Sequence, residues 1–334
     1  MTQSFMQKIL FIQTAFTGDV VLATALVEKW HHYFPGDQID FLLRKGNEGL
    51  LDNHPSIHSV LIWDKKQYKK RNLFVLFKKI RKNKYDKVIN LQRFASTGLL
   101  TGLSGAKDRI GFDKNPVSFL FTQKIKHVFD KQLHEVQRNN QLIESYTDTA
   151  FNKPKLYPSQ KDIEKISRFI MEPYVCMMPA SVWFTKQYAE EKWIELIDAF
   201  PVEYTIYLGG GPTDENLCSR ILSKTKNKKV TVVAGMFDFL SSAALMMKAK
   251  MNYTNDSAPL HFASATDAPV TAIFCSTVPE FGFYPLSEKS FVVQTKEHLS
   301  CKPCTLHGRK ACPLGHFKCA YTIETSQLSE TLNS

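Results

Sequence analysis

The sequence predicts an α/β protein made of two successive parallel sheets, each covered by helices. Short apolar segments suited to buried strands alternate with segments whose apolar residues recur at helical spacing. This alternation begins at residue 8 and starts afresh near residue 174. A chain of 334 residues is also long enough for two domains of about 100–200 residues each. We therefore expect an N-terminal domain over residues 1–160 and a C-terminal domain over residues 161–334.

The first half opens with a strand, a tight loop and a helix. KILFIQT is an apolar run, AFTGD is typical of a turn, and VVLATALVEKWHHYF has helical spacing. Later helices are expected over residues 69–84 and 134–150, and NKPKLYPSQKD is typical of a linker because of its prolines and charges. The further strands expected here are QIDFLLR, SVLIWD, DKVINLQ and RIGFD.

The second half repeats the same order of elements. The expected strands are YVCMMPA, YTIYLGGG, KVTVVAG, MNYTND and PVTAIFC. The expected helices are AEEKWIELIDAF, ENLCSRILSKT, SSAALMMKA and PLHFASAT. Two doubly wound units result.

The composition is that of an ordinary globular protein, with 43% hydrophobic and 22% charged residues. The apolar run at the N-terminus stops at Thr14 and lacks a small-residue cleavage signature, so we interpret it as a strand. No stretch approaches the roughly 18 apolar residues that span a bilayer. We expect a cytoplasmic protein, soluble or at most peripheral on a membrane, whose seven cysteines are reduced.

Positive charge is concentrated in one segment of a chain whose formal net charge is +11. From Asp64 to Lys87 there are eleven Lys or Arg against two Asp. Such a segment favours an anionic partner, which leaves nucleic acid, a phosphorylated glycolipid and a membrane surface open, as well as a merely solvated helix face. Nucleic acid is the less favoured partner because the segment has no recognisable reader motif.

Ligands of open α/β sheets bind beyond the carboxyl ends of the strands, so the loops there are candidate sites. The first is Thr17-Gly18-Asp19. Gly18 permits a close backbone approach. Asp19 is either a helix N-cap or a general base that takes a proton from an attacking hydroxyl.

The second loop is the run from Gly209 to Gly211, followed by Asp214 and Glu215. It either admits a nucleotide against bare backbone, with an acidic side chain on the ribose, or is a plain tight turn. Its spacing does not match the dinucleotide-binding fingerprint.

The third loop, residues 255–261, follows a strand and opens a helix. The free N–H groups of that helix would favour a diphosphate, with Ser257 and His261 as further donors. Capping by Asp256 and Ser257, and a buried hydrogen-bonded His261, are the alternatives. Lys186, before the EEKW helix, would offset negative charge on a diphosphate leaving group.

Taken in order, these segments resemble glycosyltransferase family 9, the lipopolysaccharide heptosyltransferases. The resemblance covers nearly the whole chain. It rests on KILFIQTAFTGDVVLATALVEKW, on INLQ with GAKDRIGF, on PASVWFTKQYAEEKW, and on NDSAPLHFASATDAPVTAIF.

The resemblance implies a GT-B fold of two facing Rossmann-like domains, with the acceptor on the N-terminal one and the nucleotide sugar on the C-terminal one. It implies an inverting transfer of a heptose or related sugar from an ADP-sugar to a lipopolysaccharide inner-core acceptor, without a catalytic metal or cofactor. Asp19 and Lys186 are the implied catalytic residues. The implied donor contacts are Gly18, Ser181, Gly209, Gly210, Asp214, Glu215, Asp256, Ser257, Ala258, Leu260 and His261, and the implied acceptor contacts are Arg93 and His134.

Two positions depart from the family pattern. Ala258 replaces a common glycine, and Lys186 is followed by Gln-Tyr-Ala where the family has Arg-Trp-Pro. These departures leave the sugar nucleotide open, and of the second pattern only the lysine matches. A catalytically silent GT-B scaffold is a separate alternative. The sequence also ends in a cysteine cluster for which both a structural zinc ion and packed reduced thiols are open. Its members are Cys301, Cys304, Cys312 and Cys319.

Overall fold

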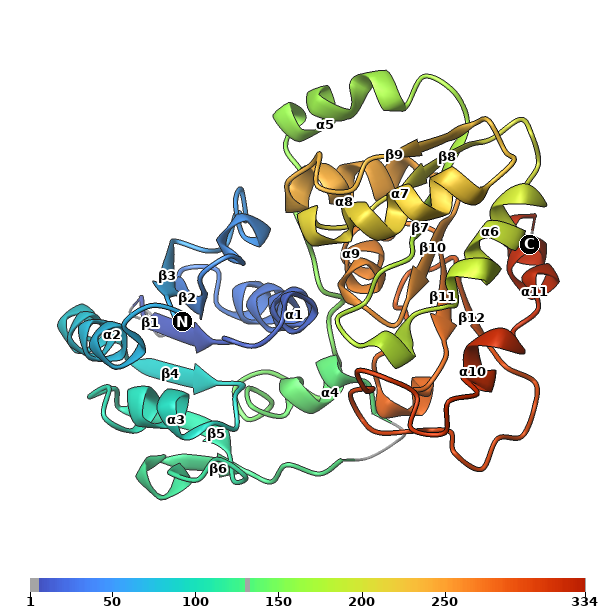
Figure 1. Cartoon of the computed structure of the whole chain (residues 1–334). Coiled ribbons are helices and arrows are strands. Elements are labelled where there is room, and N and C mark those ends of the chain that lie inside the picture. Colours follow the sequence, from blue (N-terminus) through green and yellow to red (C-terminus); the bar gives the residue numbers. More distant parts are fainter. Residues whose placement is uncertain (1–5, 130–132, 334) are drawn as a thin grey trace. The chain divides into compact units, whose positions relative to one another are not determined.

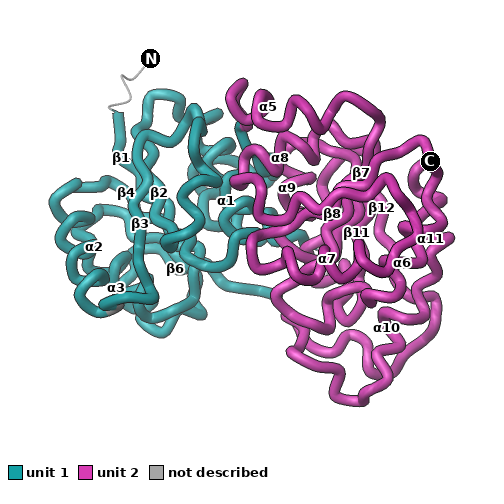
Figure 2. Tube along the Cα trace, turned by 45° about the horizontal axis from the view of Figure 1, so that its top comes forward, with its two compact units in different colours: residues 1–157 teal, residues 158–334 magenta. Residues whose placement is uncertain are grey.

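Each half of the chain forms its own parallel six-stranded sheet. The computed structural model describes residues 6–129 and 133–333. The chain divides into two units, Met1–Tyr157 and Pro158–Ser334, which Figure 2 distinguishes by colour. The predicted α/β class is confirmed.

Unit 1 has the strand order β3-β2-β1-β4-β5-β6 (Figure 1). Helices α1 and α4 pack together, as do α2 and α3, and the two pairs contribute to the layers over the sheet. The strands are Lys8–Ile12, Gln38–Arg44, Ser59–Trp63, Lys87–Asn90, Asp108–Phe112 and Gln123–Ile125 (β1 to β6). The helices are Thr17–Tyr33, Lys69–Asn83, Ala95–Gly102 and Glu135–Asn140 (α1 to α4), with short 3-10 turns at Glu48–Leu50 (η1) and Ser118–Leu120 (η2).

Unit 2 has the order β12-β11-β10-β7-β8-β9, the same connectivity as unit 1. Its strands are Tyr174–Met178, Thr205–Leu208, Val230–Val232, Asn252–Asn255, Val270–Phe274 and Ser290–Gln294 (β7 to β12). Its helices are Gln160–Ile166, Glu190–Asp198, Glu215–Lys224, Phe239–Lys248, Ala258–Thr266, Lys318–Tyr321 and Thr325–Ser329 (α5 to α11). Its 3-10 turns are Ser167–Phe169, Phe184–Lys186, Pro212–Asp214, Pro279–Phe281 and Glu330–Leu332 (η3 to η7).

The strands are apolar on both faces because helices cover both sides of each sheet. In β1, Leu10 and Ile12 pack in the cluster that includes Leu76 and Ile80 of α2. Phe11, of opposite parity in the strand, contacts Trp30 of α1 edge to face, with ring centroids 6.2 Å apart. Because successive side chains of a strand point to opposite faces of the sheet, neighbouring residues of β1 pack in separate cores.

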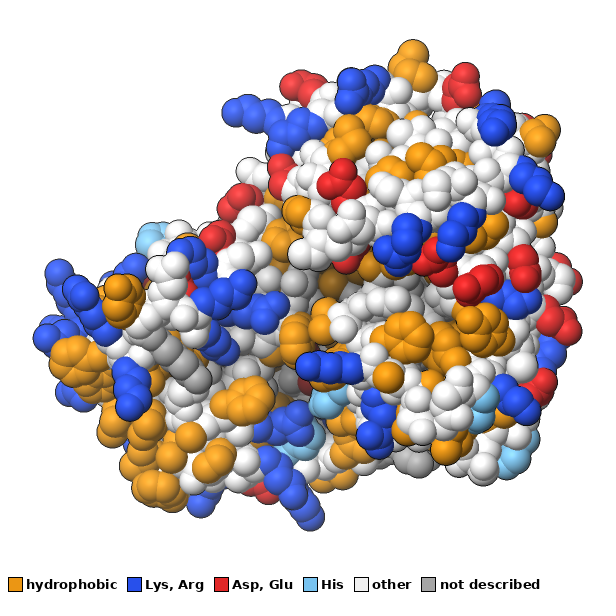
Figure 3. Space-filling model, in the orientation of Figure 1, with side chains coloured by type: hydrophobic (Ala, Val, Ile, Leu, Met, Phe, Trp, Pro, Cys, Tyr) orange, Lys and Arg blue, Asp and Glu red, His pale blue; other side chains and the backbone are white. Residues whose placement is uncertain are grey.

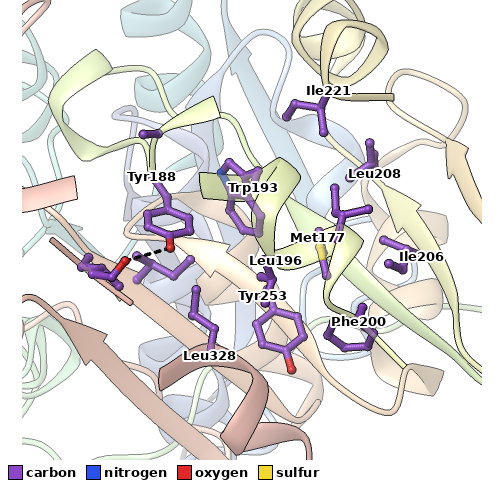
Figure 4. Close-up of a cluster of buried hydrophobic side chains, with 14 of the residues drawn as sticks. Met177, Tyr188, Trp193, Leu196, Phe200, Ile206, Leu208, Ile221, Tyr253 and Leu328 are labelled. Carbon is purple, nitrogen blue, oxygen red and sulfur yellow. Dashed lines mark hydrogen bonds between the residues drawn. The ribbon is translucent and has the colours of Figure 1, made fainter. Parts of the chain in front are cut away.

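The core of unit 2 joins its sheet to α6, α7 and the C-terminal helix α11 (Figure 4). Tyr188 and Trp193 contact edge to face at 5.5 Å between ring centroids. The Tyr188 hydroxyl donates a hydrogen bond of 3.1 Å to the backbone oxygen of Ile323. This bond ties the start of α6 to the C-terminal segment, so residues far apart in sequence share one core.

The prediction of a helix over residues 134–150 is wrong beyond residue 140, because α4 ends there and turns follow. Asn140 donates through Nδ2 to the backbone oxygen of Asp148 at 3.2 Å. Asparagine side chains that bond backbone groups in this way compete with helix formation. In the described part of the chain, no helix combines the length and apolar character needed to cross a bilayer.

Gly98 in α3 is expected to be intolerant of a side chain. A Cβ at this position would collide with Oδ1 of Asn115 and Cγ2 of Val117. We predict that Gly98→Ala lowers the free energy of unfolding by about 1–3 kcal/mol, as overpacking does, although alanine is the better helix former. Urea denaturation of the full chain measures the change.

Gly36→Ala is the matched control, because a Cβ at Gly36 has nothing within 4 Å. It should change the free energy of unfolding by less than about 0.5 kcal/mol. Equal effects of the two substitutions would contradict the packing described for α3.

Candidate active site

Both sheets have a point at which the strand order reverses, and the candidate residues gather there. In unit 1 the reversal lies between β1 and β4, and in unit 2 between β7 and β10. Loops that leave such neighbouring strands diverge, which opens a crevice beyond their carboxyl ends. Asp19 and Arg93 follow β1 and β4, whereas Lys186 and Asp256 follow β7 and β10.

Asp19 lies in the first turn of α1 and is half-buried. Its Oδ2 accepts a hydrogen bond from the backbone N–H of Phe16 at 3.1 Å. Phe16 is the N-cap residue of α1 and Asp19 is the third residue of the helix, so Asp19 is not the N-cap that the sequence suggested, although its carboxylate does bind the backbone N–H of the N-cap residue. The carboxylate also lies near Arg44, where burial lowers the pKa of the guanidinium and Asp19 partly offsets this. Capping alone does not exclude a role as a base, which stays a prediction.

The segment from Thr14 to the start of α1, which carries Gly18 and Asp19, is held by residues at the ends of β2 and β3. The hydroxyl of Thr17 donates to Oδ1 of Asn47 at 3.1 Å. Nζ of Lys65 donates to the backbone oxygen and the hydroxyl oxygen of Thr14, at 2.7 and 2.9 Å. Asn47 follows β2 and Lys65 follows β3, so the carboxyl edge of the sheet fixes the loop on which Asp19 sits. Gly18 within this loop is buried.

The two predicted acceptor contacts differ in their surroundings. Arg93 is exposed just after β4. His134 is fully buried, and its Nδ1 accepts a hydrogen bond of 3.1 Å from the backbone N–H of Val136 at the start of α4. The structure thus gives His134 a capping role, and its contact with an acceptor stays a prediction. Arg93 is also close enough to His127 to help burial lower the pKa of that imidazole.

In unit 2, Lys186 and Asp256 form an ion pair of 2.7 Å between Nζ and Oδ2. Only 15% of the Lys186 side chain and 7% of the Asp256 side chain are exposed, so solvent screens the pair weakly. The hydroxyl of Thr277, which follows β11, donates to the same Oδ2 at 2.7 Å. Asp256 is therefore placed to orient Lys186.

Asn255 fixes the loop that brings Lys186 to this position. It is the last residue of β10 and is completely buried. Its Oδ1 accepts from the backbone N–H of Tyr188 at 2.8 Å, and its Nδ2 donates to the backbone oxygen of Pro179 at 2.8 Å. One amide thus binds both ends of the segment 179–188, which contains Lys186. Gln187 adds a bond of 2.8 Å from Nε2 to the backbone oxygen of Ser181 in the same loop.

Helix α9 begins beside this pair. Ser257 is its N-cap residue but makes no capping hydrogen bond through its side chain. Its hydroxyl instead donates to the backbone oxygen of Asn255 at 3.3 Å. The alternative that the Ser257 side chain caps α9 is therefore wrong. The partial positive charge at the N-terminus of α9 is not offset by a hydrogen bond from that side chain. Ala258 opens the helix, whereas the Leu260 side chain is buried.

His261, in the first turns of α9, is buried, and its Nδ1 has no hydrogen-bond partner among the described residues. Burial, which nearby Asp256 opposes and Lys186 assists, lowers the pKa of His261 to about 4. The imidazole is therefore neutral at pH 7, with one ring nitrogen able to donate. The alternative that His261 is a hydrogen-bonded core histidine therefore does not hold for its Nδ1.

The glycine loop after β8 is shaped by close packing. A Cβ at Gly209 would lie 2.6 Å from Sδ of Met178. Gly210 has a φ of +154°, and a Cβ there would lie 2.7 Å from Oδ2 of Asp214. The same Oδ2 accepts from the backbone N–H of Gly211 at 2.8 Å, so Asp214 closes the turn. Glu215 begins α7 and is exposed. Ribose contacts by Asp214 or Glu215 stay predictions.

Several residues that hold the two edges were not singled out from the sequence, and Asn255 was included in the third loop without a role. Arg44, Asn47 and Lys65 in unit 1 end or follow strands, as Asn255 and Thr277 do in unit 2. Their position at the ends of predicted strands could have marked them as candidate site residues. Their hydrogen-bond partners could not be predicted, because these bonds join segments that are distant in sequence.

The four clustered cysteines are near one another. Sγ of Cys301 lies 4.0 Å from Nε2 of His316. Burial raises the pKa of the Cys304 thiol, and Cys301 and Cys312 add to the effect. Among the described residues, no three His, Cys, Asp or Glu side chains are arranged to hold a metal ion. A structural zinc ion at Cys301, Cys304, Cys312 and Cys319 stays a prediction.

Solved structures share this architecture. A family 9 glycosyl transferase from Veillonella parvula has a TM-score of 0.83 at 20% identity, with 98% of this chain and 97% of that one covered. The E. coli ADP-heptose lipopolysaccharide heptosyltransferase II has a TM-score of 0.78 at 20% identity, with 98% and 97% covered. The chain therefore has the GT-B fold of glycosyltransferases, as predicted.

The sequence comparison is more specific. The model of glycosyltransferase family 9 (heptosyltransferase) matches residues 73–315. The chain belongs to this family and is a glycosyltransferase. Lipopolysaccharide heptosyltransferase 3 of Escherichia coli is 27% identical over 277 residues, which cover 78% of this chain and 82% of the relative. Lipopolysaccharide heptosyltransferase 1 of Pseudomonas aeruginosa is 23% identical over 325 residues, which cover 89% and 86%.

The low pKa of His261 predicts a specific pH dependence of stability. An unfolded histidine has a pKa of about 6.5, so between that value and about 4 the unfolded chain binds a proton that the folded chain excludes. Stability is complete above pH 6.5 and falls as the pH decreases. We predict that His261→Phe removes about 2 kcal/mol of the loss between pH 7.5 and pH 5. Urea denaturation at both pH values measures it.

His298→Asn is the control, because His298 is exposed. This variant should keep the wild-type pH dependence. A His261→Phe variant with the same pH dependence as the wild type would show that His261 is readily protonated in the folded state.

Proposed function

We propose that this glycosyltransferase moves a heptose from ADP-heptose to the inner core of lipopolysaccharide, with inversion at the anomeric carbon. Membership of family 9 and curated relatives that are lipopolysaccharide heptosyltransferases support this. A solved structure of similar fold is the E. coli heptosyltransferase WaaC with ADP. The acceptor would be lipid-linked, which implies that the protein works on the cytoplasmic face of the inner membrane.

The observation that carries the donor assignment is the arrangement at the reversal point of unit 2. Lys186, the uncapped start of α9 and the unpartnered Nδ1 of His261 lie together. A cation, a helix N-terminus and a neutral imidazole suit a diphosphate. Because Asp256 would repel the same anion, we assign it the positioning of Lys186 and not a direct contact.

In the proposed reaction, Asp19 accepts the proton of an acceptor hydroxyl as its oxygen attacks the anomeric carbon of the donor. The bond from that carbon to the diphosphate oxygen breaks, and the nucleoside diphosphate leaves with the bonding electrons. Lys186 and α9 offset the charge that grows on this leaving group. Unit 1 would therefore bind the acceptor and unit 2 the donor. The proposal assigns no catalytic step to a metal ion or an organic cofactor.

Asp19→Asn tests the base assignment. An asparagine can still accept the hydrogen bond from Phe16 N–H, so α1 should keep its cap. We predict that kcat/KM for transfer from ADP-heptose falls by about a hundredfold to ten-thousandfold, the usual contribution of a general base. The affinity for ADP, measured by calorimetry, should stay close to that of the wild type.

Asp52→Asn, at an exposed position after η1, is the control and should retain full activity. Near-normal turnover by Asp19→Asn would remove the base assignment. Binding of ADP by a wild-type protein that transfers no sugar to any core acceptor would instead favour the silent scaffold.

A further inference from the structure

One end of unit 1 exposes apolar side chains beside a strongly basic helix. Phe74 and Val75 of α2 are 56% and 55% exposed, although large apolar side chains are usually inside. Leu99 of α3 and Leu103 directly after it are also exposed, and Phe119 of η2 is 73% exposed. Figure 3 shows orange and blue side chains gathered where Figure 1 places α2 and α3, at the left and lower left.

These elements form one continuous surface. Helix α2 packs against α3, and α3 packs against η2. Nη1 of Arg81 donates to the backbone oxygen of Leu103 at 3.1 Å, which fixes the C-terminal ends of α2 and α3 together. A Cβ at Gly102 would lie 2.5 Å from Cβ of Leu120, so α3 and η2 are in close contact. We call this surface, made of α2, α3 and η2, the basic-apolar face.

Its charge is of one sign. Helices α2 and α3 contain no Asp or Glu, and α2 carries the exposed cations Lys70, Arg71, Lys78, Lys79, Arg81 and Lys82. Leu76 and Ile80 are on the buried side of α2, in the core of unit 1. The exposed Phe74 lies beside a cation, because Nζ of Lys78 is 4.6 Å from the centroid of its ring.

We propose that the basic-apolar face docks onto an anionic lipid surface, with Phe74 and Phe119 inserted among the headgroups. A helix with a basic surface and exposed aromatic residues is typical of proteins that lie in the membrane interface. Lysine is depleted at protein–protein interfaces, so a second copy of the chain or another protein fits the face less well. Lipid phosphates complement a surface without acidic residues, and the apolar side chains give a reason for contact beyond charge.

The location of the face suits the proposed reaction. Helix α2 starts six residues after Trp63, the end of β3, and Lys65 between them holds the loop of Asp19. The N-terminal end of α2 is thus connected to the carboxyl edge where the acceptor would bind. Only this use of the face, to present a lipid-linked acceptor, rests on the proposed function. The binding of lipid does not.

Vesicle co-sedimentation of the full chain tests the proposal. One set of vesicles is an equimolar mixture of phosphatidylethanolamine and phosphatidylglycerol, and the other is phosphatidylcholine alone. We expect the wild type to bind the anionic vesicles and not the neutral ones. Each basic residue near an anionic surface contributes about fivefold to binding, so Lys78→Glu with Lys82→Glu should weaken it by at least about tenfold. Phe74→Ser with Phe119→Ser should also weaken it by about tenfold.

Lys228→Glu with Lys250→Glu is the matched control. It changes the net charge equally at exposed positions of unit 2 and should leave vesicle binding unchanged. A wild type that does not bind anionic vesicles would overturn the proposal, as would a control pair that weakens binding as much as the α2 pair. Binding to random-sequence RNA at lower protein concentration than to vesicles would reassign the face to nucleic acid.

A second readout separates this proposal from the proposed function. Transfer to a water-soluble, delipidated core acceptor should be unchanged in the Phe74→Ser, Phe119→Ser variant. Transfer to the same core embedded in anionic vesicles should fall about tenfold. Equal losses on both acceptors would overturn membrane docking, whereas vesicle binding without any heptose transfer would overturn only the proposed function.

Discussion

The candidate donor site depends on one buried amide at the end of a strand. Asn255 holds the backbone of Pro179 and of Tyr188 at once, and the segment between them carries Lys186. With that segment fixed, Lys186 reaches Asp256, and Thr277 completes the arrangement. A loop held by hydrogen bonds from a sheet can position a charge more accurately than a loop held by its own contacts. The remaining features of the donor site follow from this constraint.

Unit 1 solves the same structural problem in a different way. Here the hydrogen bonds come from one side of the reversal point, where Asn47 after β2 and Lys65 after β3 hold the segment around the start of α1. The result is a carboxylate on a fixed helix start, next to Arg44. The two units thus share a strand order, and at equivalent edges each pairs a carboxylate with a cation, Asp19 beside Arg44 in unit 1 and Asp256 beside Lys186 in unit 2.

Periodicity predicted the architecture because a buried parallel strand and an amphipathic helix have distinct patterns. The same patterns did not reveal α3, β6 and β12, which are short and lack a clear hydrophobic period. They also predicted that α4 continues past Asn140. Asp19, Lys186 and Asp256 were found because they follow strands. That Asp256 binds Lys186, and that His134 and Leu260 are buried, depends on packing between distant segments, which no local pattern contains.

Two asparagines on β10 test whether the amide of Asn255 holds the donor site in place. Asn255→Asp keeps the acceptor for Tyr188 N–H but loses the donor to Pro179, and we predict that it weakens ADP binding by about tenfold or more, because small displacements of positioning groups are costly. Asn252, at the opposite end of β10, donates through Nδ2 to the backbone oxygens of Met246 and Pro269 and binds no part of the segment 179–188, so Asn252→Asp should leave the affinity for ADP unchanged. Calorimetric titration of both folded variants decides, and wild-type affinity in Asn255→Asp would contradict the account.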